Sequence, residues 1–147
     1  MAKGKLYGIG IGPGDPELLT LKAVRLIREA DVIAVPGRVK EDTVAYQITV
    51  QAIPEIADKP CVPVYYPMSK DPGILEKCHT EAAMAIEAVL REGKNVAFLT
   101  LGDTTVYSTY IYVHTKIMDM GYEAEIISGI TSFCAVAARL NIGLVEK

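Results

Sequence analysis

Short apolar runs alternate with amphipathic stretches along this chain of 147 residues. The apolar runs have the length and composition of buried strands; they cover residues 5–11, 31–35, 61–65, 95–100 and 123–127. The stretches between them carry apolar residues at helical spacing; they cover residues 15–30, 43–52, 71–92, 108–120 and 131–140. Strands that are apolar on both faces and alternate with helices are typical of a parallel sheet covered on both sides. We therefore predict an α/β fold, with a mostly parallel five-stranded sheet and helices on both faces.

Turn and capping residues mark the ends of several predicted elements. Asp15 followed by Pro16 has the form of a helix start, with a side-chain acceptor before a proline. Gly93 and Gly121 each follow an amphipathic stretch, where glycine commonly ends a helix. Pro63 lies inside a predicted strand and cannot donate to a neighbouring strand, so we expect that strand at the edge of the sheet.

Composition excludes several classes of protein. The net charge is −3, without a basic stripe that would indicate nucleic-acid binding. No apolar run is long enough to span a bilayer, and glycines from Gly8 onward interrupt any signal-peptide core. The three cysteines are far apart, and Cys78 and His79 have no second ligand pair nearby. We expect a reduced, cytoplasmic protein that holds no metal and binds neither nucleic acid nor membrane.

Ligands of such sheets bind beyond the carboxyl ends of the strands. The loops at that edge are predicted at residues 10–15, 36–42, 101–107 and 128–132. Asp103 is an acceptor suited to an amino group or a ribose hydroxyl, but Asp103 or Thr104 could instead cap the next helix. Thr131 and Ser132 could likewise cap a helix, hold a polar ligand group, or do both.

The glycine-rich first loop does not fit the dinucleotide pattern G-x-G-x-x-G. The third glycine position is Pro13 when the pattern starts at Gly8, and Asp15 when it starts at Gly10. No acidic residue follows the second strand to bind the ribose 2′-hydroxyl of NAD. Arg38 and Lys40 could instead bind the 2′-phosphate of NADP, so an NADP site stays open. The loop is otherwise interpreted as a tight turn between a strand and a helix.

Taken together, three segments are more specific than any one of them. They are GIGIGPGDPELLTLKAVRLIREADVIAVPGR, LTLGDTTVYST and ISGITSFCAVAARLNIGLVEK. They resemble the tetrapyrrole (corrin/porphyrin) methylases from Leu6 to the end of the chain. TVYST and SGITSFCAVAARLNI look most like the members that methylate carbon 20 of precorrin-2 or cobalt-precorrin-2. The Gly-Gly-Asp-Pro loop of uroporphyrinogen methylases is not matched, because Leu101 replaces its first glycine and Thr104 its proline.

The resemblance implies a two-domain, homodimeric enzyme that binds S-adenosylmethionine between its domains and releases S-adenosylhomocysteine. Residues 1–140 would form the N-terminal domain and residues 141–147 the start of the linker, with the C-terminal domain absent from this chain. The positions that match the family's cofactor motifs are Pro13, Leu101, Gly102, Asp103, Val106, Thr131 and Ser132.

The implied chemistry is in-line attack of a macrocycle carbon on the sulfonium methyl group. Such a transfer depends mainly on positioning, in keeping with a sequence that shows no acid–base pair. Tyr107 is the candidate catalytic residue, as acceptor of the proton that leaves carbon 20. The carboxylates of the tetrapyrrole substrate point to Arg38 and Lys40, and to Lys70, as anion contacts. The alternatives are another tetrapyrrole methylase, a diphthine-synthase-like methyltransferase, and a non-catalytic nucleotide-binding α/β module.

Overall fold

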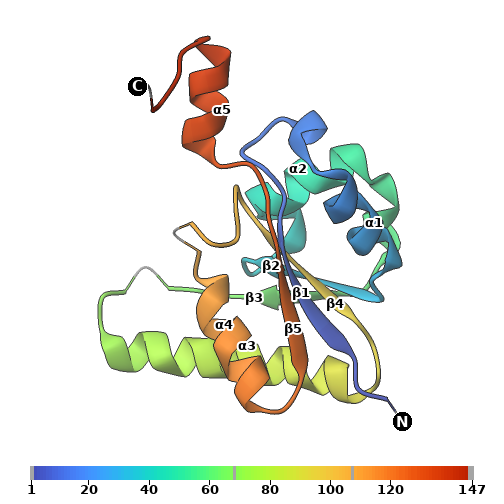
Figure 1. Cartoon of the computed structure of the whole chain (residues 1–147). Coiled ribbons are helices and arrows are strands. Elements are labelled where there is room, and N and C mark those ends of the chain that lie inside the picture. Colours follow the sequence, from blue (N-terminus) through green and yellow to red (C-terminus); the bar gives the residue numbers. More distant parts are fainter. Residues whose placement is uncertain (1, 68, 107, 146–147) are drawn as a thin grey trace.

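The computed structural model describes residues 2–67, 69–106 and 108–145 (Figure 1). One sheet contains the strands β1 (Lys5–Gly10), β2 (Val32–Pro36), β3 (Cys61–Val64), β4 (Val96–Thr100) and β5 (Glu123–Ile127). The strand order is β3-β2-β4-β1-β5, and every neighbouring pair is parallel. The helices are α1 (Leu21–Glu29), α2 (Val44–Ala52), α3 (Pro72–Arg91), α4 (Tyr110–Asp119) and α5 (Ser132–Arg139). This architecture confirms the predicted fold class.

The sheet lies between two helical layers, each with its own core. Because successive side chains of a strand point to opposite faces, β4 serves both layers. Ala97 and Leu99 pack in the core beneath α1 and α2, while Val96 and Phe98 pack in the core beneath α3 and α4. In Figure 1 these two layers flank the sheet, and α5 stands away from it beyond the carboxyl ends of the strands.

Most predicted boundaries are confirmed, and one helix start is corrected. Asp15 caps only a short 3-10 turn, Pro16–Leu18, by accepting a hydrogen bond from the Glu17 amide at 2.9 Å. The helix α1 begins later, after Thr20, whose hydroxyl accepts from the Ala23 amide at 3.0 Å. Two further 3-10 turns, Lys40–Asp42 and Pro54–Asp58, flank α2 and have no counterpart in the predictions.

The strand that contains Pro63 is confirmed as an edge strand, because within the described part of the chain β3 pairs only with β2. The expected helix ends are also confirmed, since Gly93 and Gly121 adopt positive φ angles of 84° and 90° after α3 and α4. Cys134 lies in an apolar segment of the kind expected in a core, but in α5 it is exposed. Its helix projects from the domain, and among its residues only Ala137 is buried.

Candidate functional site

The loops that follow β1, β4 and β5 meet at three glycines. A Cβ atom added to Gly129 would lie 2.3 Å from the carbonyl oxygen of Gly102 and 2.7 Å from the backbone of Gly10. No other residue type therefore fits at position 129 without moving backbone. These three glycines, Gly10, Gly102 and Gly129, are called the glycine junction below.

A short bridge ties the first loop to the β4 loop beside this junction. The Gly12 amide donates to the Gly102 carbonyl at 3.1 Å, and the Gly102 amide donates back to the Gly12 carbonyl at 2.8 Å. Both glycines adopt positive φ angles, 86° and 71°, which other residues rarely tolerate. The first loop and the β4 loop are thus tied to each other by a pair of main-chain hydrogen bonds.

Asp103 joins the β4 loop to the β5 loop through both of its carboxylate oxygens. One oxygen accepts from the Ser128 hydroxyl at 2.9 Å and from the Gly129 amide at 2.7 Å. The other accepts from the Thr105 amide at 3.0 Å and from the Thr105 hydroxyl. Asp103 is only 6% exposed. Its carboxylate is therefore saturated by donors from the protein itself.

These contacts keep Asp103 ionised. Burial by itself would raise the pKa of its carboxyl group, but the hydrogen bonds from Thr105, Gly129 and Ser128 outweigh that effect and lower the pKa to about 2. The neighbouring Thr104 hydroxyl, which is fully buried, lies within hydrogen-bond distance of the carbonyl oxygens of Gly8 at 3.1 Å and Ile127 at 3.2 Å. The side chains of residues 103–105 thus make hydrogen bonds within the protein that connect β4 with β1 and β5.

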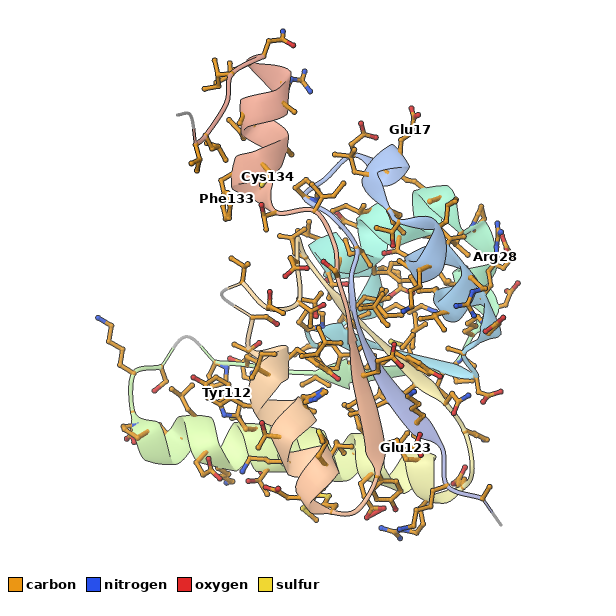
Figure 2. The ribbon with its side chains drawn as sticks, in the orientation of Figure 1. Glu17, Arg28, Tyr112, Glu123, Phe133 and Cys134 are labelled. Atoms are coloured by element: carbon orange, nitrogen blue, oxygen red, sulfur yellow. The ribbon has the colours of Figure 1, made fainter. Side chains whose placement is uncertain are left out.

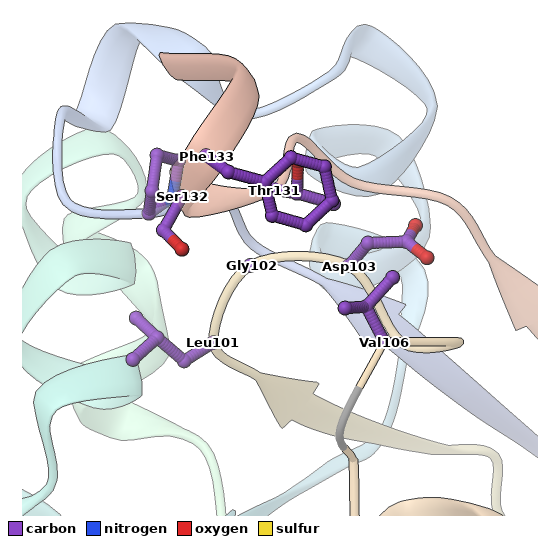
Figure 3. A pocket seen from close by; sticks show the side chains of 8 residues that line it. Leu101, Gly102, Asp103, Val106, Thr131, Ser132 and Phe133 are labelled. Carbon is purple, nitrogen blue, oxygen red and sulfur yellow. The ribbon is translucent and has the colours of Figure 1, made fainter. Parts of the chain in front are cut away.

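A pocket of about 220 Å³ opens at this edge, between the β4 loop and the start of α5. Its lining residues are Pro13, Leu101, Gly102, Asp103, Val106, Thr131, Ser132 and Phe133. Figure 3 shows Leu101 and Val106 on one side of the pocket and Ser132 and Phe133 on the other. All residues that the sequence suggests for cofactor binding thus line one pocket.

Two sequence interpretations need qualification. The alternative role of Thr131 is confirmed, because its hydroxyl caps α5 by accepting from the Cys134 amide at 3.3 Å. Tyr107, the candidate catalytic residue, lies outside the described residues.

Phe133 is the lining residue that sequence analysis missed. It is 49% exposed and lies at the base of α5, next to Cys134 (Figure 2). The signal that could have found it is an aromatic residue directly after the Thr131-Ser132 pair, in the first turn of a helix that begins at the ligand-binding edge.

The predicted anion contacts lie outside the pocket. The Arg38 guanidinium lies over the Tyr65 ring, with its carbon 4.0 Å from the ring centre. The Lys40 ammonium donates to the Ala57 carbonyl at 3.1 Å and therefore already has a partner in the fold. Lys70 is exposed just before α3.

A second hollow of about 170 Å³ adjoins the pocket, and Leu101 lines both. It lies at the carboxyl ends of β2 and β4; its other lining residues are Pro36, Phe98, Thr100, Ser108, Thr109 and Tyr110. The hydroxyl oxygen of Thr100 is buried there and has no hydrogen-bond partner among the described residues. This hollow extends the site from the pocket toward the loop that carries Arg38.

The loop geometry disfavours a dinucleotide site. Pyrophosphate binding requires free backbone amides at the start of the helix after β1. The Ile11 and Gly12 amides instead donate to Thr100 and Gly102, and a 3-10 turn separates the loop from α1. Among the described residues, no cluster of three His, Cys, Asp or Glu side chains is arranged to hold a metal ion. No helix in the described ranges is long and apolar enough to cross a membrane.

The pocket has the chemistry to hold part of S-adenosylmethionine. Its apolar walls, Leu101, Val106 and Phe133, suit a flat ring, and the hydroxyls of Thr131 and Ser132 suit polar groups. Its volume is smaller than the roughly 300–1,000 Å³ of typical ligand pockets. The residues therefore fit one portion of the molecule, and the rest requires walls from beyond this pocket.

Comparison with known proteins agrees with this geometry. The family described as Tetrapyrrole (Corrin/Porphyrin) Methylases matches residues 5–147. A Methanocaldococcus jannaschii protein named "Probable cobalt-precorrin-2 C(20)-methyltransferase" is 43% identical over 144 residues, which are 97% of this chain and 60% of that protein. The cobalt-precorrin-2 C(20)-methyltransferase of Salmonella typhimurium is 37% identical over 142 residues, which are 96% of this chain and 59% of that protein.

A solved structure shows the same fold. Uroporphyrin-III C-methyl transferase from Thermus thermophilus, complexed with S-adenyl homocysteine, is 27% identical and superimposes with a TM-score of 0.67. The match covers 98% of this chain and 54% of that one. The chain thus spans about 60% of the length of the curated relatives named above. From residue 5 to residue 147, the chain belongs to the tetrapyrrole (corrin/porphyrin) methylase family.

Proposed function

We propose that this chain is the N-terminal half of an S-adenosylmethionine-dependent methyltransferase that acts on carbon 20 of precorrin-2 or cobalt-precorrin-2, in cobalamin biosynthesis. One observation carries the proposal: residues from three separate loops, chosen on their sequence motifs, converge on a single pocket at the carboxyl edge of the sheet. The names of the relatives that are 43% and 37% identical support the choice of substrate.

In this proposal, different side chains of the pocket make the apolar and the polar contacts with the methyl donor. Leu101, Val106 and Phe133 exclude water from one portion of it, while the hydroxyls of Thr131 and Ser132 offer polar groups. Asp103 keeps the two walls at a fixed separation through its bonds to Ser128 and Gly129. When bound, S-adenosylmethionine supplies an electrophilic methyl group to a nucleophilic carbon of the macrocycle.

Catalysis in this proposal comes mainly from alignment of the two reactants. A rigid pocket wall lowers the entropic cost of that alignment, and the glycine junction makes the wall rigid. The proton that leaves carbon 20 needs an acceptor, and Tyr107 remains our predicted acceptor. Arg38 and Lys40 remain the predicted contacts of the substrate carboxylates.

We also propose that a C-terminal domain completes the site, with residues 141–147 starting the linker, and that the whole enzyme is a cytoplasmic homodimer. The apolar surface of α5 supports the first part. Phe133 and Val136 on this projecting helix, and Leu140 directly after it, are each about half exposed or more. A soluble domain rarely leaves such a stripe uncovered.

The test uses the full-length gene product and isothermal titration with S-adenosylhomocysteine, with NADP as the competing ligand. We expect saturable binding of S-adenosylhomocysteine and none of NADP. Methyl transfer to cobalt-precorrin-2 and to precorrin-2, followed by mass spectrometry, then identifies the acceptor. Ser132→Ala should weaken S-adenosylhomocysteine binding, whereas Thr115→Ala on the exposed side of α4 should leave it unchanged.

Each outcome separates the alternatives. Binding of S-adenosylhomocysteine with methylation of a different tetrapyrrole would identify another member of the family. Absence of S-adenosylhomocysteine binding, or a preference for NADP, would contradict the proposal and favour the nucleotide-binding module.

A further inference from the structure

Arg38 and Tyr65 form a pair at the carboxyl edge of the sheet that the fold does not need. Arg38 follows β2 and Tyr65 follows β3, and these two strands are paired in parallel. The guanidinium carbon lies 4.0 Å from the centre of the Tyr65 ring. Both side chains are exposed, Tyr65 at 46%. The pair therefore contributes little to the core.

Arg38 has hydrogen-bonding capacity that nothing else in the described chain takes up. Among the described residues, no acidic side chain forms an ion pair with it, although Glu41 and Asp42 are close in sequence. A guanidinium on an aromatic face keeps its N–H groups free at its edge, where they match a carboxylate in a two-pronged hydrogen bond. The ring also restricts the motion of the arginine before any ligand arrives.

The position of the pair relative to the pocket is suitable for a large acceptor molecule. The strand order places β2 and β3 beside β4, and the pocket lies over β4, β1 and β5. Two and a half strand spacings of about 4.8 Å separate the middle of β3–β2 from β1, the middle strand below the pocket, or roughly 12 Å. The second hollow, lined by Pro36, Thr100 and Leu101, fills the interval.

We propose that Tyr65 is a positioning residue: its ring holds Arg38, already our predicted contact of the substrate carboxylates, in the place where the guanidinium anchors one carboxylate of the acceptor macrocycle. The inference rests on the proposed function, because it takes the macrocycle to reach from the methyl-donor pocket to this pair. Tyr65 acts only through the arginine, so its contribution depends on the aromatic ring and on the presence of the guanidinium.

The test measures the KM for cobalt-precorrin-2 in the full-length enzyme. Arg38→Gln should raise this KM about tenfold or more, the usual effect of losing a hydrogen bond between charged groups. Tyr65→Leu should raise it about two- to fivefold, the range expected from an exposed cation–π contact. Tyr65→Phe, which retains the ring, should stay within about twofold of the wild type, and kcat should change little in all three variants.

Two comparisons give the test its specificity. Arg25→Gln, which removes an exposed arginine on α1, should leave the KM unchanged. In the double variant, Tyr65→Leu should add nothing to Arg38→Gln. An unchanged KM for Arg38→Gln would overturn the inference, and so would additive effects in the double variant.

Binding of uroporphyrin, a tetrapyrrole with carboxylate side chains, provides a readout that does not depend on methyl transfer. Its fluorescence should report weaker binding to Arg38→Gln than to the wild type, by about tenfold or more. If the wild type methylates nothing but this difference persists, the proposed function fails and the anchor stands. If the wild type methylates cobalt-precorrin-2 and both readouts are insensitive to Arg38, the anchor alone fails.

Discussion

The substitution Asp103→Asn tests whether the carboxylate holds the two pocket walls together. Asparagine has the same shape but offers one acceptor oxygen, and its amide nitrogen is a donor. If the side-chain nitrogen takes the place of the oxygen near Thr105, the Thr105 amide loses its acceptor. If it takes the place of the oxygen near Ser128 and Gly129, the Gly129 amide loses its acceptor. One backbone N–H is therefore unpaired in either orientation.

The structure supports two estimates of the cost. Leaving a buried donor unpaired costs about 1–3 kcal/mol. Lowering the pKa of Asp103 from its ordinary 3.8 to about 2 corresponds to roughly 2 kcal/mol, at about 1.4 kcal/mol per pH unit. Both describe the same hydrogen bonds, so they are not added. We expect a loss of about 2 kcal/mol, or about 4–8 °C in Tm for a domain of this size.

Thermal unfolding followed by circular dichroism measures this loss, with Asp58→Asn as the control on an exposed turn. The pH dependence gives a second readout. Because the folded-state pKa of Asp103 is depressed, its stabilisation is present above pH 3.8 and is lost as the pH falls toward 2. In Asp103→Asn, stability should depend less on pH over that interval. A variant that melts within about 2 °C of the wild type, with the same acid profile, would refute the assignment.

Further variants test other parts of the structure. Gly129→Ala should destabilise the domain by about 1–3 kcal/mol and weaken S-adenosylhomocysteine binding, because its Cβ would collide with the Gly102 carbonyl; chemical denaturation and calorimetry measure the two effects. Thr131→Ala should cost about 1 kcal/mol by removing the cap of α5, and an unchanged denaturation midpoint would argue against the cap. Burial lowers the pKa of His79 below 6.5, so the unfolded chain takes up its proton first and stability should fall as the pH drops below 6.5. In thermal melts between pH 7.5 and 5.5, the stability of His79→Phe should fall less steeply with pH than that of the wild type. An equal pH dependence in the two proteins would contradict this.

The elements of the fold could be predicted because their sequence signals are local. Proline inside β3 indicated an edge strand, and the alternation of apolar runs with amphipathic stretches indicated a parallel sheet. The pocket was predictable for a related reason, since all strands of a parallel sheet end at one edge. Any motif that follows a strand is therefore brought to that edge.

Other features depend on contacts between distant residues, which local patterns do not encode. The order of the strands is one of them. The contacts of Asp103 are another: beside the ligand contact or helix cap that the sequence suggests, its carboxylate accepts hydrogen bonds from Ser128 and Gly129, which belong to a different loop. The exposure of Cys134 belongs here too, because an apolar helix segment is expected in a core unless its helix projects.

The glycine junction has a consequence for how such a domain can evolve and be redesigned. Its contacts run from backbone to backbone, so they constrain the three glycines and leave the surrounding side chains free to change. Under the proposed function, mutations of the rim residues Pro36 and Thr109 should alter which acceptor is accommodated, while the proposed methyl-donor pocket keeps its shape. A library aimed at new acceptors should therefore randomise that rim and retain Gly10, Gly102 and Gly129.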